Sequence, residues 1–158
     1  MAIDYQAHSP IPRPIRAVFD ANIYVAAYLS KNSRNPNKEL FRRWRDDEFV
    51  FLVSEAILQE VIKKFDERGI DQALTVELVS FILADAETVL TPVEEIPTLI
   101  VDDPDDDQVL ACAIAGQADY LVTYDPHFDC LGGAYHGIHV LDGLHFLYVV
   151  RGDTKPPV

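Results

Sequence analysis

Residues 15–20 read Ile-Arg-Ala-Val-Phe-Asp, a short and mostly apolar run that follows two prolines and ends in an acid. Such a run predicts a buried strand whose last residue, Asp20, lies where the strand meets solvent. Residues 120–125, Tyr-Leu-Val-Thr-Tyr-Asp, repeat the pattern, and Pro126 then stops the strand after Asp125. Because ligands bind at the carboxyl ends of strands in open parallel sheets, we expect both acids at one binding edge.

Apolar runs of strand and helix type alternate along the chain. We expect strands at residues 15–20, 49–53, 88–91, 119–124 and 138–141. We expect helices near residues 22–29, 36–46, 55–67, 71–86, 105–116 and 142–149. This alternation is typical of a parallel sheet with helices on both faces. The predicted fold class is therefore α/β, with about five strands in a central, mostly parallel sheet.

Two further acids lie on predicted helices. Ser54 is a good N-cap residue, and Glu60 follows it about two helical turns later. Asp106 lies in the first turn of the alanine-rich helix 105–116, where unsatisfied N–H groups favour negative charge. Together with the two strand-end acids they make four carboxylates on four elements. Carboxylate oxygens are the ligands that Mg²⁺ and Mn²⁺ prefer, so the pattern predicts a site for such ions.

Length and composition fit one compact domain, since the chain has 158 residues and 49% of them are hydrophobic. We expect the domain at residues 15–150, a loosely ordered segment at 1–14 and a flexible tail at 151–158. No apolar run approaches the roughly 20 residues that cross a bilayer, and the N-terminus does not resemble a signal peptide. We therefore expect a cytoplasmic protein without membrane contacts.

The net charge of −13 argues against a nucleic-acid partner, because phosphate binding depends on Lys and Arg. However, six of the thirteen basic residues lie between Lys31 and Arg45, with Phe41 and Trp44 among them. One interpretation is an amphipathic helix with a buried aromatic face and solvated arginines. The other is a surface that contacts RNA or a protein partner through Arg42, Arg43, Trp44 and Arg45.

Four ordered motifs resemble those of the PIN-domain nucleases, and more closely the VapC-like branch of toxins from toxin–antitoxin systems. Residues 18–22, VFDAN, are similar to the family's first strand, with Ala21 in place of a hydroxyl residue. Residues 54–61 (SEAILQEV), 103–113 (DPDDDQVLACA) and 118–125 (ADYLVTYD) resemble the three later motifs. This register selects four motif acids: Asp20, Glu60, Asp106 and Asp125.

The resemblance implies a three-layer α/β/α fold and an endoribonuclease that cleaves RNA with Mg²⁺ or Mn²⁺. It implies that the four motif acids are catalytic and bind metal. Asp103, in the acidic run before Asp106, is a further candidate as an accessory carboxylate. It also implies an antitoxin protein as partner and a homodimer. We expect Asn22 and Thr123 to orient the carboxylates or a water molecule by hydrogen bonds.

The main alternative is a catalytically silent PIN module that binds RNA or protein, although all four motif acids are present. The alternating acids at 103–107 suggest a calcium loop, but Gln108 and Ile114 replace the glycine and the glutamate that such a loop needs. An aspartyl-phosphate phosphatase needs an acid two residues after its nucleophile, and Asn22 occupies that position.

Overall fold

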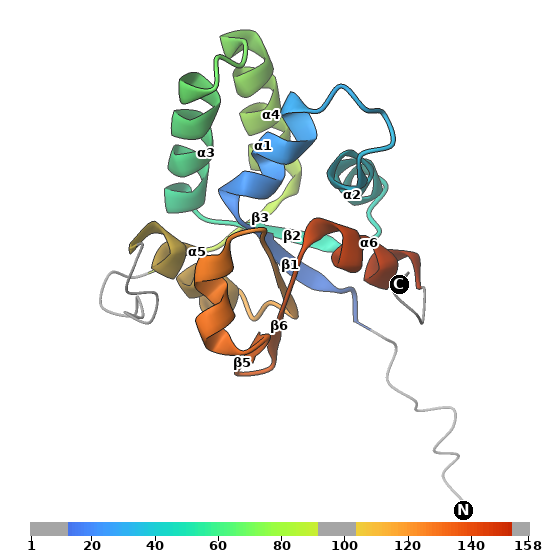
Figure 1. Ribbon diagram of the computed structural model, residues 1–158, viewed down its shortest axis with the longest axis vertical. Coiled ribbons are helices and arrows are strands. Elements are labelled where there is room, and N and C mark those ends of the chain that lie inside the picture. The colour runs from blue at the N-terminus through green and yellow to red at the C-terminus, as the bar shows by residue number, and fades with distance from the viewer. Residues whose placement is uncertain (1–12, 92–103, 153–158) are drawn as a thin grey trace, which may run out of the picture.

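The computed structural model describes residues 13–91 and 104–152 (Figure 1). Its strands are β1 (Arg16–Phe19), β2 (Val50–Val53), β3 (Glu87–Thr88), β4 (Tyr120–Val122), β5 (Ala134–Tyr135) and β6 (Ile138–Leu141). Its α-helices are α1 (Ala21–Leu29), α2 (Pro36–Arg45), α3 (Glu55–Glu67), α4 (Gln72–Asp85), α5 (Pro104–Ala115) and α6 (Gly143–Arg151). A 3₁₀ helix spans Pro126–Leu131. Within the described ranges, no helix is both long and apolar enough to cross a membrane.

The strands form one sheet in the order β3-β2-β1-β4-β6-β5. All neighbouring pairs are parallel except β5 with β6. The chain leaves β1 toward β2 and β3 on one side, and it later returns to add β4 and β6 on the other. The strand order therefore reverses between β1 and β4, and the carboxyl ends of these two strands form the crevice where ligands bind in such sheets. The predicted α/β class is confirmed.

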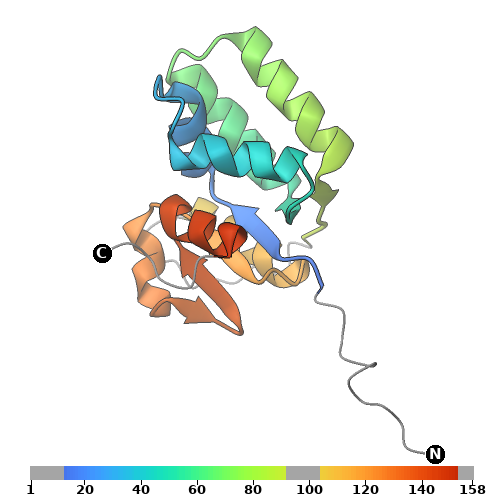
Figure 2. The ribbon, with the colours of Figure 1, turned by 90° about the vertical axis from the view of Figure 1, so that its right-hand side faces the viewer.

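Helices cover both faces of the sheet. On one face the Phe19 ring contacts aromatic rings from α1, α2 and α6, including Tyr24, Phe41 and Phe146. On the other face α5 lies so close that a Cβ at Gly116, just after the helix, would be 3.0 Å from the Leu52 side chain. In Figures 1 and 2, α1 to α4 lie together on one side of β1, and α5 lies on the other.

Helix starts are set by side-chain caps at the ends of strands and loops. Asp20 accepts a hydrogen bond from the Ala21 N–H at the start of α1, and Ser54 accepts one from Ile57 at the start of α3. Asp142 caps α6 through the His145 N–H. Each cap satisfies a backbone donor that the first helical turn leaves without a partner. The short polar residues thus fix where strand becomes helix.

Two details of the sheet differ from the sequence prediction. It has six strands rather than about five, because residues 134–135 form a hairpin with β6. β3 consists of residues 87–88 instead of 88–91. Gly132, Gly133 and Gly137 have positive φ around the hairpin, and they support tight turns in a segment with little apolar periodicity. The expected segment 1–14 and tail 151–158 lie almost wholly outside the described residues.

Candidate active site

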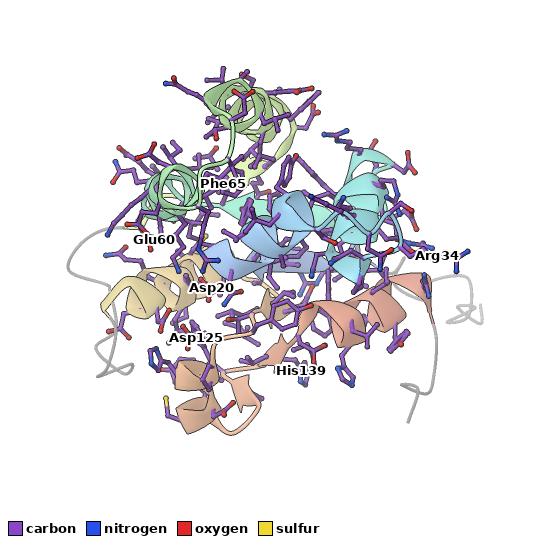
Figure 3. All side chains as sticks on the ribbon, turned by 45° about the horizontal axis from the view of Figure 1, so that its top comes forward. Asp20, Arg34, Glu60, Phe65, Asp125 and His139 are labelled. Carbon is purple, nitrogen blue, oxygen red and sulfur yellow. The ribbon has the colours of Figure 1, made fainter. Side chains whose placement is uncertain are left out.

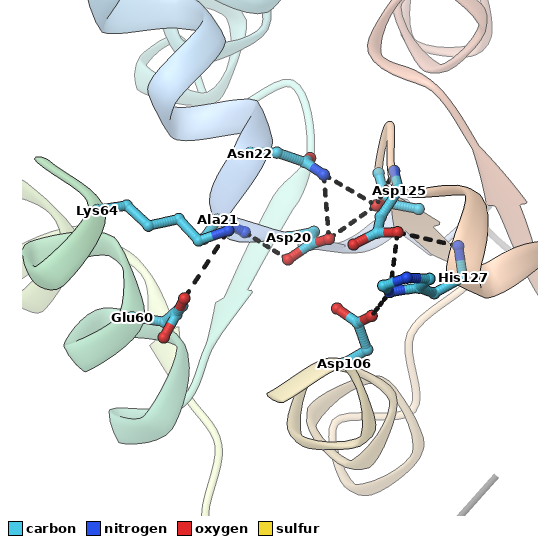
Figure 4. Close-up of polar contacts among 9 residues, drawn as sticks. Asp20, Ala21, Asn22, Glu60, Lys64, Asp106, Asp125 and His127 are labelled. Atoms are coloured by element: carbon cyan, nitrogen blue, oxygen red, sulfur yellow. Dashed lines mark hydrogen bonds and ion pairs between the residues drawn. The ribbon is translucent and has the colours of Figure 1, made fainter. Parts of the chain in front are cut away.

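Asp20 lies where β1 ends and α1 begins, at the reversal of strand order. Its side chain is buried, with 6% of the residue exposed. One carboxylate oxygen accepts a hydrogen bond from the Ala21 N–H at 2.7 Å, and the other accepts one from the Thr123 hydroxyl at 2.8 Å. These contacts fix the carboxylate across the β1–β4 crevice, and Figure 4 shows them.

Asn22 and Thr123 link the ends of the two strands, as expected from their positions in the sequence. The Asn22 amide nitrogen lies 3.3 Å from an Asp20 oxygen and 3.4 Å from the Thr123 hydroxyl. The Asn22 carbonyl oxygen accepts a hydrogen bond from the Tyr124 N–H, and the Thr123 hydroxyl accepts one from the Asp125 N–H. Asn22 and Thr123 therefore fix the position of the β1 end, which carries Asp20, relative to the β4 end, which leads to Asp125.

Asp20, Glu60 and Asp106 line one small cavity, which we call the acidic cavity. Its volume is about 30 Å³, enough for an ion or a water molecule. Lys64 also lines it, with Nζ 3.8 Å from a Glu60 carboxylate oxygen one helical turn away. Asp106 is 4% exposed, so the cavity contains two buried carboxylates and one that is partly exposed.

Asp125 joins this group through His127. Asp125 caps the 3₁₀ helix by accepting a hydrogen bond from the His127 N–H at 2.9 Å. The His127 Nδ1 atom lies 2.9 Å from an Asp106 oxygen and 3.2 Å from an Asp125 oxygen. One ligand atom from each of these three residues lies within 4.8 Å of the other two. Figures 3 and 4 show the acids converging from separate elements.

Burial raises the pKa of the Asp20 carboxyl group above its usual value of 3.8. The hydrogen bonds from Thr123 and Ala21 oppose this shift, and the positive charge of Lys64 also lowers the pKa. The negative charge of Asp125 raises it. A buried carboxylate that is crowded by another acid is a site where a bound cation would be stabilising.

The donor set fits a divalent cation. The residues that face one another offer carboxylate oxygens from Asp20, Glu60, Asp106 and Asp125 and one imidazole nitrogen from His127. Carboxylates suit Mg²⁺ and Mn²⁺, and imidazole is also a ligand of Mn²⁺ and later transition metals. Among the described residues, the group of potential metal ligands contains no cysteine, and burial raises the pKa of the Cys112 thiol to about 12.

Comparison with known proteins assigns the family. The family model described as PIN domain matches residues 16–127, which include all four predicted acids and His127. The chain belongs to the PIN domain family. The match confirms the family resemblance that the sequence motifs predicted.

This PIN domain has the fold of a solved toxin structure. Mycobacterium tuberculosis VapC20, described as a sarcin-ricin loop cleaving toxin, matches with a TM-score of 0.55 and 13% sequence identity. The match covers 78% of this chain and 98% of that chain. No curated protein matches this chain. The likeness to VapC20 supports the predicted three-layer fold, because similarity at this level of identity concerns the fold.

The PIN domain brings three of the four predicted acids into one cavity, with Asp125 adjacent. Asp103, predicted as an accessory carboxylate, lies outside the described residues. Asp107 is 6% exposed, so it is buried like Asp106. The roles of these residues in metal binding and catalysis stay predictions.

The expected contact surface around Trp44 needs a correction. Trp44 is 4% exposed, and its ring packs 4.9 Å from that of Phe51, so it belongs to the core. Arg43 is engaged by Glu39 and Glu48. Arg42 and Arg45 are exposed, and with Lys38, Phe41, Tyr28 and Ala27 they line a second pocket of about 260 Å³, the cationic pocket.

Sequence reasoning missed His127 and Lys64. His127 follows Asp125 by two residues, and the Asp-Pro start of a 3₁₀ helix turns its ring back toward the capping acid. Lys64 follows Glu60 by four residues, the spacing that places two side chains on one helical face. Both signals were present in the sequence, in the residues just after each motif acid.

Proposed function

We propose that this PIN domain is a divalent-metal-dependent endoribonuclease that hydrolyses RNA phosphodiester bonds. The observation that supports this proposal most directly is that Asp20, Glu60 and Asp106 line one cavity, with Asp125 beside it. Four acids from four separate elements would repel one another, and a cation among them offsets that repulsion.

Each part of the site has a role in this proposal. Asp20 and Asp106 provide most of the metal ligands, and Glu60 and Asp125 bind the ion directly or through water. Bound Mg²⁺ or Mn²⁺ supplies an activated water and neutralises charge on the scissile phosphate. Asn22 and Thr123 keep Asp20 in place by the hydrogen bonds described above. Lys64 adds a positive charge at the edge of the cavity where the substrate's phosphates enter.

We also propose that the protein acts as the toxin of a toxin–antitoxin pair in the cytoplasm. Its fold likeness to VapC20, a sarcin-ricin loop cleaving toxin, supports this finer assignment. A homodimer belongs to the same proposal, and α4 offers a surface for it. Large apolar side chains of α4 are exposed there: Leu74, Val76, Phe81 and Leu83. Exposed apolar side chains of this kind can pack in a protein interface.

The nuclease is tested by incubating the purified protein with tRNA, a sarcin–ricin loop hairpin, unstructured RNA and single-stranded DNA. Each substrate is tested with Mn²⁺, with Mg²⁺ and with EDTA. We expect RNA cleavage that needs metal and falls at least 100-fold in Asp20→Asn and Asp106→Asn, since each change removes a charge at the metal. Asp129→Asn is the matched control, because Asp129 is exposed and is not among the residues that line the acidic cavity.

Two outcomes would count against the nuclease. Cleavage that persists in EDTA or in both cavity variants would show that another protein or another site is responsible. Binding of RNA without cleavage in any metal, together with metal binding measured by calorimetry, would favour the catalytically silent PIN module instead.

A further inference from the structure

His127 places a nitrogen atom among the acids of the site, although the motifs contain only carboxylates. Its Nδ1 atom lies 2.9 Å from an Asp106 oxygen and 3.2 Å from an Asp125 oxygen. The ring comes from the 3₁₀ helix, and Asp106 comes from the first turn of α5. The histidine therefore bridges two elements at the edge of the acidic cavity (Figure 4).

The spacing of these three donors suits a single six-coordinate ion. In an octahedral site with bonds of about 2.1 Å, two adjacent ligand atoms are about 3.0 Å apart. The two distances from Nδ1, 2.9 Å and 3.2 Å, are those of a hydrogen bond and an ion pair in the protein without metal, and they also lie close to this value. The third pair of ligand atoms, the Asp106 and Asp125 oxygens, lies within 4.8 Å. A small movement of either side chain would bring all three atoms to the spacing of one ion's ligands.

The backbone that carries the ring is constrained by its neighbours. The His127 N–H donates to Asp125 Oδ1, so Asp125 fixes the backbone of the residue whose ring it also contacts. Pro126 at the first position of the 3₁₀ helix restricts the backbone further. The contacts of the ring with Asp106 and Asp125 orient it toward these acids, so less conformational entropy is lost when it binds an ion.

We propose that His127 Nδ1 is a direct ligand of the active-site metal, together with Asp106 and Asp125, and that it biases the site toward Mn²⁺ over Mg²⁺. Imidazole nitrogen is a ligand of first-row transition metals, to which Mn²⁺ belongs, whereas Mg²⁺ favours oxygen and keeps its waters. This inference rests on the proposed metal-dependent function and deepens it. It assigns a ligand and a metal preference to the same site.

His145 provides a matched comparison within the chain. Its Nδ1 atom also lies close to an acid, 2.7 Å from an Asp142 oxygen. However, it contacts the one cap residue of its own helix, and it lies outside the group of potential metal ligands found in the described residues. A change of His145 therefore removes a histidine–aspartate pair without affecting the proposed ligand set.

The test is pulsed electron paramagnetic resonance of Mn²⁺ bound to the full chain, with calorimetric titrations of Mn²⁺ and Mg²⁺. Wild type and His145→Gln should show modulation from a directly coordinated ¹⁴N nucleus. His127→Gln should lose that modulation and about tenfold or more of its Mn²⁺ affinity, while its Mg²⁺ affinity changes less than threefold. If His127→Gln folds poorly, the wild-type spectrum still tests the proposal, because a wild type without coordinated ¹⁴N excludes any histidine ligand.

The outcomes separate this inference from the proposed function. If Mn²⁺ binds and RNA is cleaved but the wild-type spectrum shows no coordinated ¹⁴N, the proposal of a histidine ligand is overturned and the proposed nuclease function is retained. If neither Mn²⁺ nor Mg²⁺ binds the wild type, both proposals are overturned. If ¹⁴N modulation persists in His127→Gln, another histidine is the ligand and the assignment of His127 is wrong.

Discussion

At the scale of single residues, Asp20 both supports the local structure and lowers the stability of the fold. The side chain caps α1 and accepts a hydrogen bond from Thr123, so it contributes to local structure. Burial nevertheless raises the pKa of its carboxyl group, which means that the charged form is less stable in the fold than in water. At neutral pH and without metal, the ionised carboxylate of Asp20 therefore destabilises the native state.

Asp20→Asn should stabilise the protein in EDTA. Asparagine keeps a carbonyl oxygen for the Ala21 N–H and removes the buried charge. We expect the free energy of unfolding to rise by about 1 kcal/mol at pH 7, as is common when a functional charge is removed. Because the pKa of Asp20 is raised in the fold, its cost is present above that pKa and disappears below 3.8, where both states are protonated.

Urea unfolding at pH 7 and at pH 4 measures this effect. The gain from Asp20→Asn should shrink at the lower pH, and Asp129→Asn should show no gain at either pH. A variant that is less stable than wild type at pH 7 would mean that the hydrogen bonds to Asp20 outweigh its desolvation.

Residue types at strand ends were sufficient to predict the acids but not their partners. Asp20 and Asp125 each end an apolar run, so the edge of the sheet that they share follows from the sequence. His127 and Lys64 enter the site through the geometry of a 3₁₀ turn and one helical turn. Of the two interpretations of residues 31–45, the structure agrees for Trp44 with the buried aromatic face and not with the contact surface.

At the scale of secondary-structure elements, helix caps and strand ends were predictable because they depend on local chemistry. α3 spans the predicted residues 55–67, and β6 the predicted residues 138–141. The β5 strand was not predicted, because two residues carry no periodic signal and pairing with β6 decides it. Close contacts between distant elements also lack a local signal, and Gly143 is an example.

Gly143 lies at the first position of α6, where it packs against α2 and the end of β4. A Cβ at this position would lie 2.0 Å from the Asn37 side-chain oxygen and 2.8 Å from the Tyr124 hydroxyl. Asn37 is buried, and its amide is hydrogen-bonded to Tyr124 at 3.1 Å, so neither group moves freely. We expect Gly143→Ala to cost about 1–3 kcal/mol of stability, the usual cost of overpacking.

A thermal melt should therefore show a lower Tm for Gly143→Ala by several degrees. The double variant Gly143→Ala with Asn37→Ala removes the clashing amide, so it should be less destabilised than the two single changes added together. An unchanged Tm in Gly143→Ala would show that α6 can shift away from α2 without cost.

At the scale of the whole molecule, the charge distribution decides how an acidic protein can bind RNA. The net charge is −13, and the acidic cavity would repel a phosphodiester unless a cation occupied it. The cationic pocket supplies the opposite charge through Lys38, Arg42 and Arg45. Tyr28 in this pocket is eight residues along α1 from Asp20, a rise of about 12 Å, which is a distance that a short RNA strand spans.

Arg42 is the residue of the cationic pocket that best tests RNA contact. It is exposed, and no ion pair in residues 13–91 and 104–152 is recorded for it, whereas Arg45 lies 4.5 Å from the Phe81 ring centroid. In an Asp106→Asn background, which prevents cleavage, Arg42→Gln should weaken RNA binding several-fold. The slope of log affinity against log salt should fall by about 0.7, the loss of one phosphate contact to a single strand.

Fluorescence anisotropy with labelled RNA and Mn²⁺ measures both quantities. Arg34→Gln is the matched control, because it removes the same charge from an exposed residue far from the acidic cavity (Figure 3). Its affinity should change by less than a factor of two. Equal losses in the two variants would mean that net charge acts at long range and that the cationic pocket does not contact RNA. An unchanged affinity in Arg42→Gln would assign the pocket to another partner, such as an acidic peptide.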